Sequence, residues 1–214
     1  MILYGFWRSS ATWRVRVALA HKGLAFDYRP VNTQREGGGE QHEPGYLALN
    51  PMGQVPLLVV DEGGTSARIA QSMAILEYLE ERHPERPLLP HDPLARARAR
   101  QLAEIVNAGI QPLQNTSVQR HVRALGQDDR AWVVHWVARG LGALEAEARA
   151  SAGRFAVGDA PSFADVCIVP ELYFARRFAV DLARYPTLLR IEQACAELDA
   201  FQKAHADRQP DRPR

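Results

Sequence analysis

The pattern of the chain changes at a short proline-rich stretch, residues 84–93, in which four of the ten positions are proline. Proline cannot continue a helix, and several prolines together stiffen a connector. Before this stretch, short apolar runs alternate with segments of helical spacing, whereas the long segments after it all repeat apolar residues at helical intervals. The change predicts an α/β domain over 1–83 and an all-α domain over 94–206, joined by residues 84–93.

The first 83 residues predict strands and helices in the order β-α-β and then β-β-α. Gly23 follows a basic helical turn and tolerates left-handed dihedral angles, so we expect it to end the first helix. The polar segment 33–45 contains three consecutive glycines, Gly37 to Gly39, and predicts an exposed loop of the kind that often borders a site. The expected strands are residues 2–4, 26–31, 57–60 and 67–70. The first helix is expected to begin near Ser10, and Ser72 is expected to cap the second.

The region after residue 93 predicts four long helices. Ser162 and Asp165 stand three residues apart at the start of the third helix, as a capping box requires. Cys195 falls on the apolar face of the fourth helix and is expected in the core. Residues 207–214, with two prolines and three arginines, predict a disordered tail. The expected helices span about 94–124, 128–150, 162–178 and 187–205.

Composition argues against several classes of protein. The 214 residues include 26 basic and 25 acidic side chains, so no excess positive charge attracts nucleic acid or an anionic membrane. No apolar run reaches the roughly eighteen residues of a membrane-spanning helix, and the N-terminus lacks a signal-peptide layout. With only two cysteines, a reducing cytoplasm fits best. Neither H-E-x-x-H, C-x-x-C nor G-x-S-x-G occurs, which argues against a metal site and a serine hydrolase.

The segment from Phe6 to Leu19 is the first candidate for a functional site, because it passes from an apolar strand through a polar turn into a helix. Ser9 and Ser10 stand where that helix begins, and their hydroxyl groups can cap its free N–H groups. The same N–H groups and the helix dipole favour a bound anion or thiolate. On its own, the serine pair is better explained as a helix cap than as a catalytic site.

Two further segments strengthen the case for a ligand. Pro56 lacks an N–H and can begin the third strand only at an edge or a bend, which exposes the backbone of Val55 to an extended, peptide-like ligand. Gln71 and Ser72 stand at the next helix N-terminus, where a hydroxyl and backbone N–H groups can hold a carboxylate. Each segment alone has an ordinary structural explanation. A thiol-stabilising turn, an exposed edge backbone and a carboxylate site together match the parts of glutathione.

On these motifs the chain resembles the zeta-class glutathione transferases, the group that includes maleylacetoacetate and maleylpyruvate isomerases. The resemblance covers almost the whole length. It implies a thioredoxin-like N-terminal domain with a mixed four-stranded sheet, an all-helical C-terminal domain, a cis peptide bond between Val55 and Pro56, and a homodimer. The motifs that carry it are SSATWRVR at 9–16, ALNPMGQVP at 48–56, QS at 71–72, GIQPLQN at 109–115, FAVDL at 178–182 and YPT at 185–187.

The resemblance also implies roles for single residues. Ser9 and Ser10 are the candidates that stabilise the thiolate of glutathione. The residues expected to bind glutathione are Gln41, Gln54, Val55, Gln71, Ser72, Gln111 and Asn115, and those expected to bind substrate carboxylates are Arg8, Arg176 and Arg177. The serine motif of the family usually has cysteine at its third position, where this chain has Ala11, so we expect no role for a protein thiol in this turn.

The activity implied is glutathione-dependent cis–trans isomerisation of a maleyl dicarboxylate to its fumaryl form, in the catabolism of aromatic compounds. The thiolate adds to the activated double bond, the resulting single bond rotates, and elimination returns the cofactor. The alternatives are a general transferase or peroxidase that consumes glutathione, and a non-catalytic module with the same fold. Maleylacetoacetate and maleylpyruvate share the same enone acid and differ only at the distal end, so the sequence leaves both open as substrates.

Overall fold

The computed structural model describes residues 1–36 and 38–213, and these form two compact units. The N-terminal unit comprises Met1–Pro87 and the C-terminal segment that starts at Leu198, and the helical unit is Leu88–Glu197. Gly37 of the predicted glycine loop and Arg214 of the predicted tail lie outside the described residues.

A four-stranded sheet forms the centre of the N-terminal unit, with strand order β2-β1-β3-β4. The strands are β1 (Ile2–Gly5), β2 (Asp27–Pro30), β3 (Leu57–Glu62) and β4 (Thr65–Ala70). Strands β1 and β2 are parallel, while β3 is antiparallel to both β1 and β4. The predicted mixed sheet of a thioredoxin-like domain is therefore confirmed.

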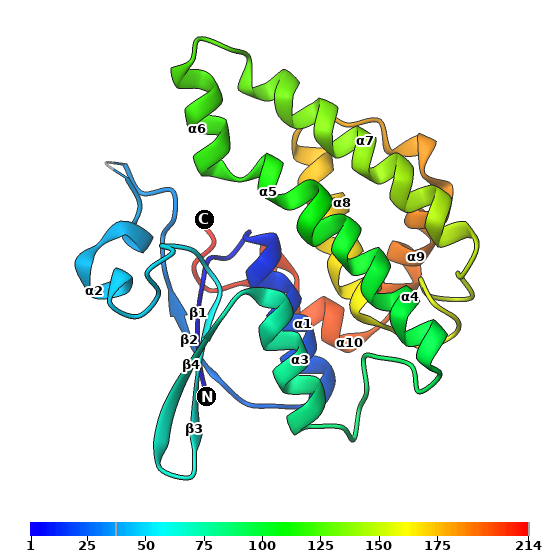
Figure 1. Ribbon diagram of the computed structural model, residues 1–214, viewed down its shortest axis with the longest axis horizontal. Coiled ribbons are helices and arrows are strands. Elements are labelled where there is room, and N and C mark those ends of the chain that lie inside the picture. The colour runs from blue at the N-terminus through cyan, green and yellow to red at the C-terminus, as the bar shows by residue number, and fades with distance from the viewer. Residues whose placement is uncertain (37, 214) are drawn as a thin grey trace. The chain divides into compact units, whose positions relative to one another are not determined.

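Two helices, α1 (Ser10–Lys22) and α3 (Ser72–Arg82), pack against one another beside the sheet (Figure 1). The apolar residues Val15, Ala18 and Leu19 of α1 are fully buried, as their helical spacing predicts. The helix ends at Gly23, whose φ of 72° is the left-handed conformation expected of a C-terminal glycine. A 3-10 turn (Glu40–His42) and the short helix α2 (Pro44–Leu47) follow the loop after β2.

The C-terminal segment differs from the sequence-based expectation, which placed it in the helical domain and in a disordered tail. Helix α10 (Asp199–Ala204) packs along α1, and a 3-10 turn (Ala206–Arg208) follows it (Figure 1). The carboxylate of Asp211 accepts hydrogen bonds from the Trp7 N–H and the Tyr28 hydroxyl. The polar composition of residues 207–214 predicts that they are solvated, but the Asp211 side chain binds residues near the start of the chain instead.

The helical unit contains more breaks than the sequence pattern predicts. Its elements are α4 (Pro93–Glu104), a π-helical turn (Ile105–Ile110), α5 (Gln111–Gln114), α6 (Thr116–Ala124), α7 (Asp129–Arg149), α8 (Phe163–Arg177), a 3-10 turn (Leu182–Arg184) and α9 (Pro186–Ala196). The prediction of one helix over 94–124 is wrong, because Asn115 takes an extended ψ of 144° and caps α6. The prediction of one helix over 187–205 is wrong as well, because Leu198 is extended between α9 and α10.

Local signals inside the helical unit are confirmed. Ser162 and Asp165 form a capping box at the start of α8, in which the Asp165 carboxylate accepts from the N–H and the hydroxyl of Ser162. It also accepts from the N–H of Ala156 at 2.8 Å, which ties the preceding loop to the helix. Cys195 is fully buried, as expected of a core position.

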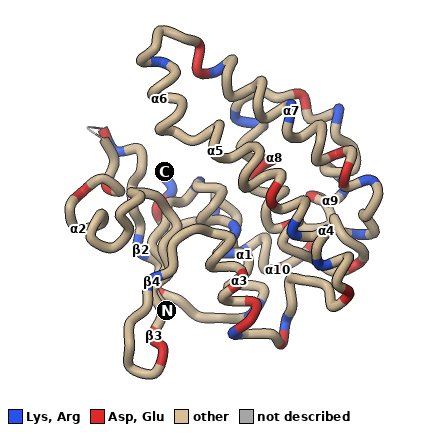
Figure 2. The backbone as a smooth tube through the Cα atoms, viewed as in Figure 1, with Lys and Arg blue, Asp and Glu red and all other residues tan. Residues whose placement is uncertain are grey.

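Charged residues of both signs are interspersed along the described chain (Figure 2), consistent with the net charge of +1. Across residues 1–36 and 38–213, no helix is both long enough and apolar enough to cross a bilayer.

Candidate active site

The strand register brings the candidate segments of the N-terminal unit to one end of its sheet. Tyr4 of β1 pairs with Leu57 of β3, and Leu57 pairs with Ala70 of β4. Strand β1 therefore ends, β3 begins and β4 ends at the same level. The segments just beyond these residues carry Ser9 and Ser10, Val55, and Gln71 and Ser72, so the topology places all three at one end of the sheet.

Residues 6–9 form a tight loop between β1 and α1, and together with Ser10 they are called the serine turn below. The N–H of Ser9 donates to the carbonyl of Phe6 at 3.0 Å, and the Oγ of Ser9 accepts from the N–H of Thr12 at 3.2 Å. Ser9 is therefore the N-cap of α1, and Ser10 is the first residue of the helix. A side chain at Gly5 would come within 2.2 Å of the Thr12 methyl group, so glycine is required for the helix to begin so close to the strand.

Ala11, at the position of the family cysteine, is only 8% exposed. The side chain at this position therefore packs mainly into the protein, which limits what a thiol there could reach.

The segment before β3 contains the predicted cis peptide bond between Val55 and Pro56, which is confirmed. The preceding carbonyl, of Gln54, accepts hydrogen bonds from the Tyr46 hydroxyl and the Asn50 amide, each at 2.7 Å. Burial raises the pKa of Tyr46 to about 12, so its hydroxyl remains a donor at neutral pH. Strand β3 begins only at Leu57, so these bonds orient the chain around Val55 outside the sheet ladder.

Gln71 and Ser72 connect β4 to α3. Gln71 has a φ of 70°, which is uncommon for a residue other than glycine and marks a locally strained backbone. The expectation that Ser72 caps α3 is corrected here, because Gln71 occupies the N-cap position and Ser72 is the first helical residue. Ser72 is buried, and its Oγ accepts a hydrogen bond from Arg14 at 3.2 Å.

Sequence reasoning missed the role of Arg14. The side chain is completely buried in α1, and its guanidinium group lies behind the predicted carboxylate site at Ser72. One signal was available, because Arg14 and Arg16 alternate with the apolar residues Trp13, Val15 and Val17, and the helix is buried on several faces. Two arginines in so apolar a helix need buried partners.

Two other predicted residues of the N-terminal unit have local contacts. Gln41 is buried in the 3-10 turn, and its Nε2 donates to the carbonyl of Thr33 at 3.4 Å. The guanidinium of Arg8 lies 5.8 Å from the ring centre of Phe6 and 5.5 Å from that of Trp7, within the range of cation–π attraction. Arg8 therefore belongs to the serine turn, as its place in the sequence predicts.

The remaining predicted site residues belong to the helical unit. Gln111 begins α5 directly after the π-helical turn, an irregularity that is frequent at functional sites. The Oδ1 of Asn115 accepts from the N–H of Ser117 at 3.1 Å, so this side chain caps α6.

Arg176 and Arg177 at the end of α8 differ in their partners. Arg176 forms a two-pronged ion pair with Glu192, which raises the pKa of the arginine. Arg177 lies 5.7 Å from the ring centre of Phe174, and burial lowers its pKa. No carboxylate among the described residues pairs with Arg177. Arg177 is therefore the better placed of the two to bind a ligand carboxylate.

Comparison with known proteins assigns the family. A maleylacetoacetate isomerase of Pseudomonas aeruginosa is 48% identical over 216 residues, which cover 100% of this chain and 99% of that protein. The N-terminal domain model of glutathione S-transferases matches residues 8–82. The chain belongs to the zeta-class glutathione transferase family.

Solved structures of zeta-class relatives share the whole fold. The maleylacetoacetate isomerase of Anaeromyxobacter dehalogenans, with glutathione bound in its active site, is 55% identical, with a TM-score of 0.92 and coverage of 99% of this chain and 97% of that one. A zeta-class maleylpyruvate isomerase is 40% identical, also with a TM-score of 0.92, and both chains are covered completely. The predicted membership of the zeta class and its two-part fold are confirmed.

Proposed function

We propose that this protein is a glutathione-dependent cis–trans isomerase of a maleyl dicarboxylate. The observation that carries the proposal is the meeting of three segments at one end of the sheet: the serine turn, the backbone around Val55, and Gln71 with Ser72. Each segment suits one part of glutathione, and close relatives are named maleylacetoacetate or maleylpyruvate isomerases.

The donor groups of the N-terminal unit fit glutathione. Ser72, with the buried cation of Arg14 behind it, suits the carboxylate at the γ-glutamyl end. The backbone of Val55 lies outside the sheet ladder and can pair with the peptide groups. Gln54 and Gln71 lie on two of these segments, and Gln41 lies on the 3-10 turn before α2. Gln111 and Asn115 of the helical unit are further proposed contacts. When bound, glutathione supplies the thiolate that adds to the activated double bond and is released unchanged.

Ser9 is the proposed donor to the thiolate. Its oxygen already accepts the N–H of Thr12, and accepting a hydrogen bond makes the hydroxyl a better donor to a second partner. The N-cap position also places that hydroxyl at the positive end of the α1 dipole. Together these groups favour the ionised thiol over the neutral one, as activation of a thiol requires. Ser10, inside the first turn of the helix, is the weaker candidate.

Arg177 and Arg8 are the proposed contacts to substrate carboxylates. Arginine presents paired N–H donors that match a carboxylate, and Arg177 has none of the ion pairing that engages Arg176. A dicarboxylate with an activated double bond needs such anchors and also stabilisation of the enolate that forms when sulfur adds. The requirement for two carboxylates separates this activity from a general transferase, whose substrates are apolar electrophiles.

The decisive experiment is an ultraviolet assay of the purified protein with maleylacetoacetate and with maleylpyruvate, each with and without glutathione. The proposal expects isomerisation that requires glutathione and leaves its concentration unchanged. Consumption of glutathione with an apolar electrophile, in the absence of isomerisation, would identify a general transferase. Binding of glutathione without turnover of any of these substrates would identify a non-catalytic module.

A homodimer is proposed from the family resemblance. Met52, on the loop before Val55, is 64% exposed and supplies apolar surface that a partner subunit would cover. Light scattering coupled to size-exclusion chromatography should give twice the monomer mass of 23.9 kDa. A single species of monomer mass at micromolar concentration would contradict the proposal.

We also propose a cytoplasmic location. Both cysteines are free thiols buried in the helical unit. A reducing compartment suits a protein without disulfide bonds and supplies reduced glutathione. Cell fractionation that places the protein outside the cytoplasm would contradict this proposal.

A further inference from the structure

We propose that the C-terminal segment holds the serine turn in its working geometry, with Asp211 and Arg16 as positioning residues for Ser9. The inference rests on the proposed function, because it takes Ser9 to be the donor to the thiolate. Neither residue need touch glutathione or substrate, since both act on the backbone that carries Ser9.

The backbone of Trp7, at the centre of the turn, is held from both sides. Its N–H donates to Oδ2 of Asp211 at 2.9 Å, and its carbonyl accepts from Nη2 of Arg16 at 2.8 Å. The neighbouring carbonyl of Phe6 accepts from Nη1 of Arg16 at 3.4 Å and from the N–H of Ser9 at 3.0 Å. The conformation that presents Ser9 is therefore fixed by bonds from α1 and from a segment 204 residues away in the sequence.

Arg16 joins the turn to the C-terminal segment. Its side chain is 2% exposed, and its Nε donates to the carbonyl of Ala204 at the end of α10 at 3.2 Å. Burial lowers the pKa of Arg16 to about 10, while Tyr28 and Asp211 favour its charged form, so the guanidinium is still a cation at neutral pH. The hydroxyl of Tyr28 donates to Asp211 at 3.2 Å and orients that carboxylate.

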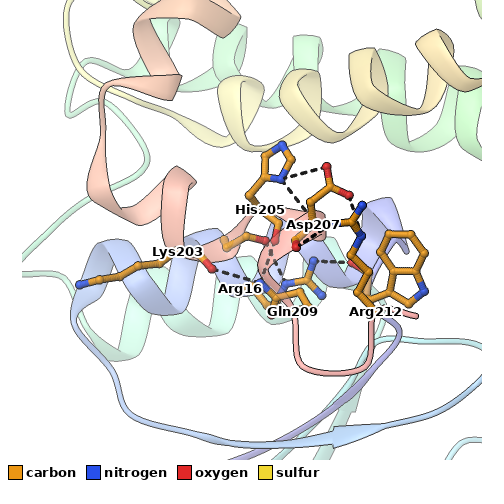
Figure 3. A network of polar contacts seen from close by, with 8 residues as sticks. Arg16, Lys203, His205, Asp207, Gln209 and Arg212 are labelled. Carbon is orange, nitrogen blue, oxygen red and sulfur yellow. Dashed lines mark hydrogen bonds and ion pairs between the residues drawn. The ribbon is translucent and has the colours of Figure 1, made fainter. Parts of the chain in front are cut away.

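The residues after α10, which include Asp211, fold back on α10 (Figure 3). The side-chain amide of Gln209 donates to the carbonyls of Lys203 at 3.1 Å and His205 at 2.9 Å. Arg212 pairs with Asp207 at 3.4 Å, so an ion pair closes the loop that contains Asp211. The ring of His205 packs edge-on against Trp13 of α1, with ring centres 4.8 Å apart. These contacts make the segment a fixed support for the turn.

Fixing the turn matters because a donor stabilises a thiolate only when it is placed within a few tenths of an ångström of the required position. A turn that loses the Asp211 bond can still cap α1, but it spends less time in the conformation that aims Ser9 at the sulfur. The expected defect is therefore in activation of the thiol, with little change in the affinity for glutathione, whose carboxylate is held elsewhere.

The test compares full-length Asp211→Ala and Asp211→Asn with matched Asp199→Ala and Asp199→Asn. Asp199 is an exposed carboxylate of the same segment, paired with Lys203, and serves as the control. Four quantities are measured on each protein: the pKa of the glutathione thiol in the complex by ultraviolet titration, the kcat, the glutathione KM, and hydrogen exchange in a peptide that contains Trp7.

For Asp211→Ala we expect the bound thiol pKa to rise by roughly half a unit or more and kcat to fall roughly three- to thirty-fold, below the loss for removing a donor outright. The glutathione KM should stay within about two-fold, and exchange in the Trp7 peptide should increase. Asp211→Asn should shift each quantity part of the way, because an amide oxygen accepts without charge. If Asp211→Ala does not fold, Asp211→Asn alone must still move the thiol pKa upward relative to Asp199→Asn.

A thiol pKa that is lowered in the wild-type complex and has the same value in Asp211→Ala or Asp211→Asn would overturn the inference. The proposed function would stand after that result. A wild-type complex whose thiol titrates like free glutathione would be a different result, because it would remove the activating role of the turn itself and both proposals with it.

Discussion

The guanidinium of Arg14 donates a hydrogen bond to the hydroxyl oxygen of Ser72 across 3.2 Å, and both side chains are buried. The two residues are 58 positions apart in the sequence and join α1 to the start of α3. A buried cation behind a hydroxyl group strengthens the site for an anion, because the low-polarity surroundings screen the charge weakly.

Arg14→Gln should therefore weaken glutathione binding by roughly ten-fold, the effect of losing about 1.4 kcal/mol of charge-assisted binding. Saturated turnover should change much less, because the carboxylate is bound alike in the ground and transition states. Isothermal titration with glutathione measures the effect, with the exposed Arg29→Gln as control. Ser72→Ala should show the same pattern, so a lower kcat with unchanged glutathione KM in either variant would contradict the assignment.

The two serines of the turn should be separable by titration of the bound thiol. In the wild-type complex we expect a thiol pKa below the free value near 8.5. Ser9→Ala should raise that pKa and lower kcat by roughly ten- to a thousand-fold, whereas Ser10→Ala should cost much less. Ser9→Ala also removes an N-cap, at about 1 kcal/mol of folding stability, so thermal unfolding is measured in parallel. A larger loss for Ser10→Ala would move the donor to Ser10.

Restoring the family cysteine should have little effect on activity. Ala11→Cys places a thiol at a position that is 8% exposed, and the attacking sulfur belongs to glutathione. We expect isomerase activity within a few-fold of wild type, measured as kcat/KM for the dicarboxylate. A large gain in activity would mean that a protein thiol takes part and that the role given to the hydroxyl groups is incomplete.

Arg177→Ala should raise the KM for the dicarboxylate by roughly ten-fold or more, because it removes a paired donor to a carboxylate. The glutathione KM should stay near its original value. Arg176→Ala is the matched control on the same helix, and its main effect should be on stability through loss of the Glu192 ion pair. If Arg176→Ala raised the substrate KM and Arg177→Ala did not, the assignment of the two residues would have to be exchanged.

The capping box of α8 predicts a pH-dependent component of stability. Burial raises the pKa of Asp165 to about 6, although the hydrogen bonds from Ala156 and Ser162 act in the opposite direction. The native protein then binds this proton more tightly than the unfolded chain, whose carboxyl group titrates near 3.9. The proton therefore contributes to the free energy of unfolding, and this contribution is complete below pH 4 and is lost as the pH rises through 6.

Asp165→Asn carries no charge at any pH and should lack this component. The difference between the free energies of unfolding, wild type minus Asp165→Asn, should therefore decrease between pH 4 and pH 7 by up to roughly 3 kcal/mol. Urea denaturation at four pH values measures it. A difference that is constant across this range would show that the hydrogen bonds keep the pKa of Asp165 near its ordinary value.

Sequence patterns predicted the elements whose signals are local. The left-handed Gly23, the capping box of Ser162 and Asp165, and the four strands all depend on residues a few positions apart, and each is present in the structure. The long helices were predicted less well. Apolar spacing continues through Asn115 and Leu198, where the backbone becomes extended, because burial on the two sides of a break can keep the same periodicity.

By itself, therefore, the sequence determined the family, the order of strands and helices in the N-terminal unit, and the three segments that resemble a glutathione site. Only the tertiary structure decided that Arg14 lies behind Ser72 and that Asp211 holds the N–H of Trp7. The physical reason is that composition and periodicity describe average solvation, and they predict that charged residues are exposed. A buried or half-buried charge needs a specific partner, and when that partner is 58 or 204 residues away, only the folded chain identifies it.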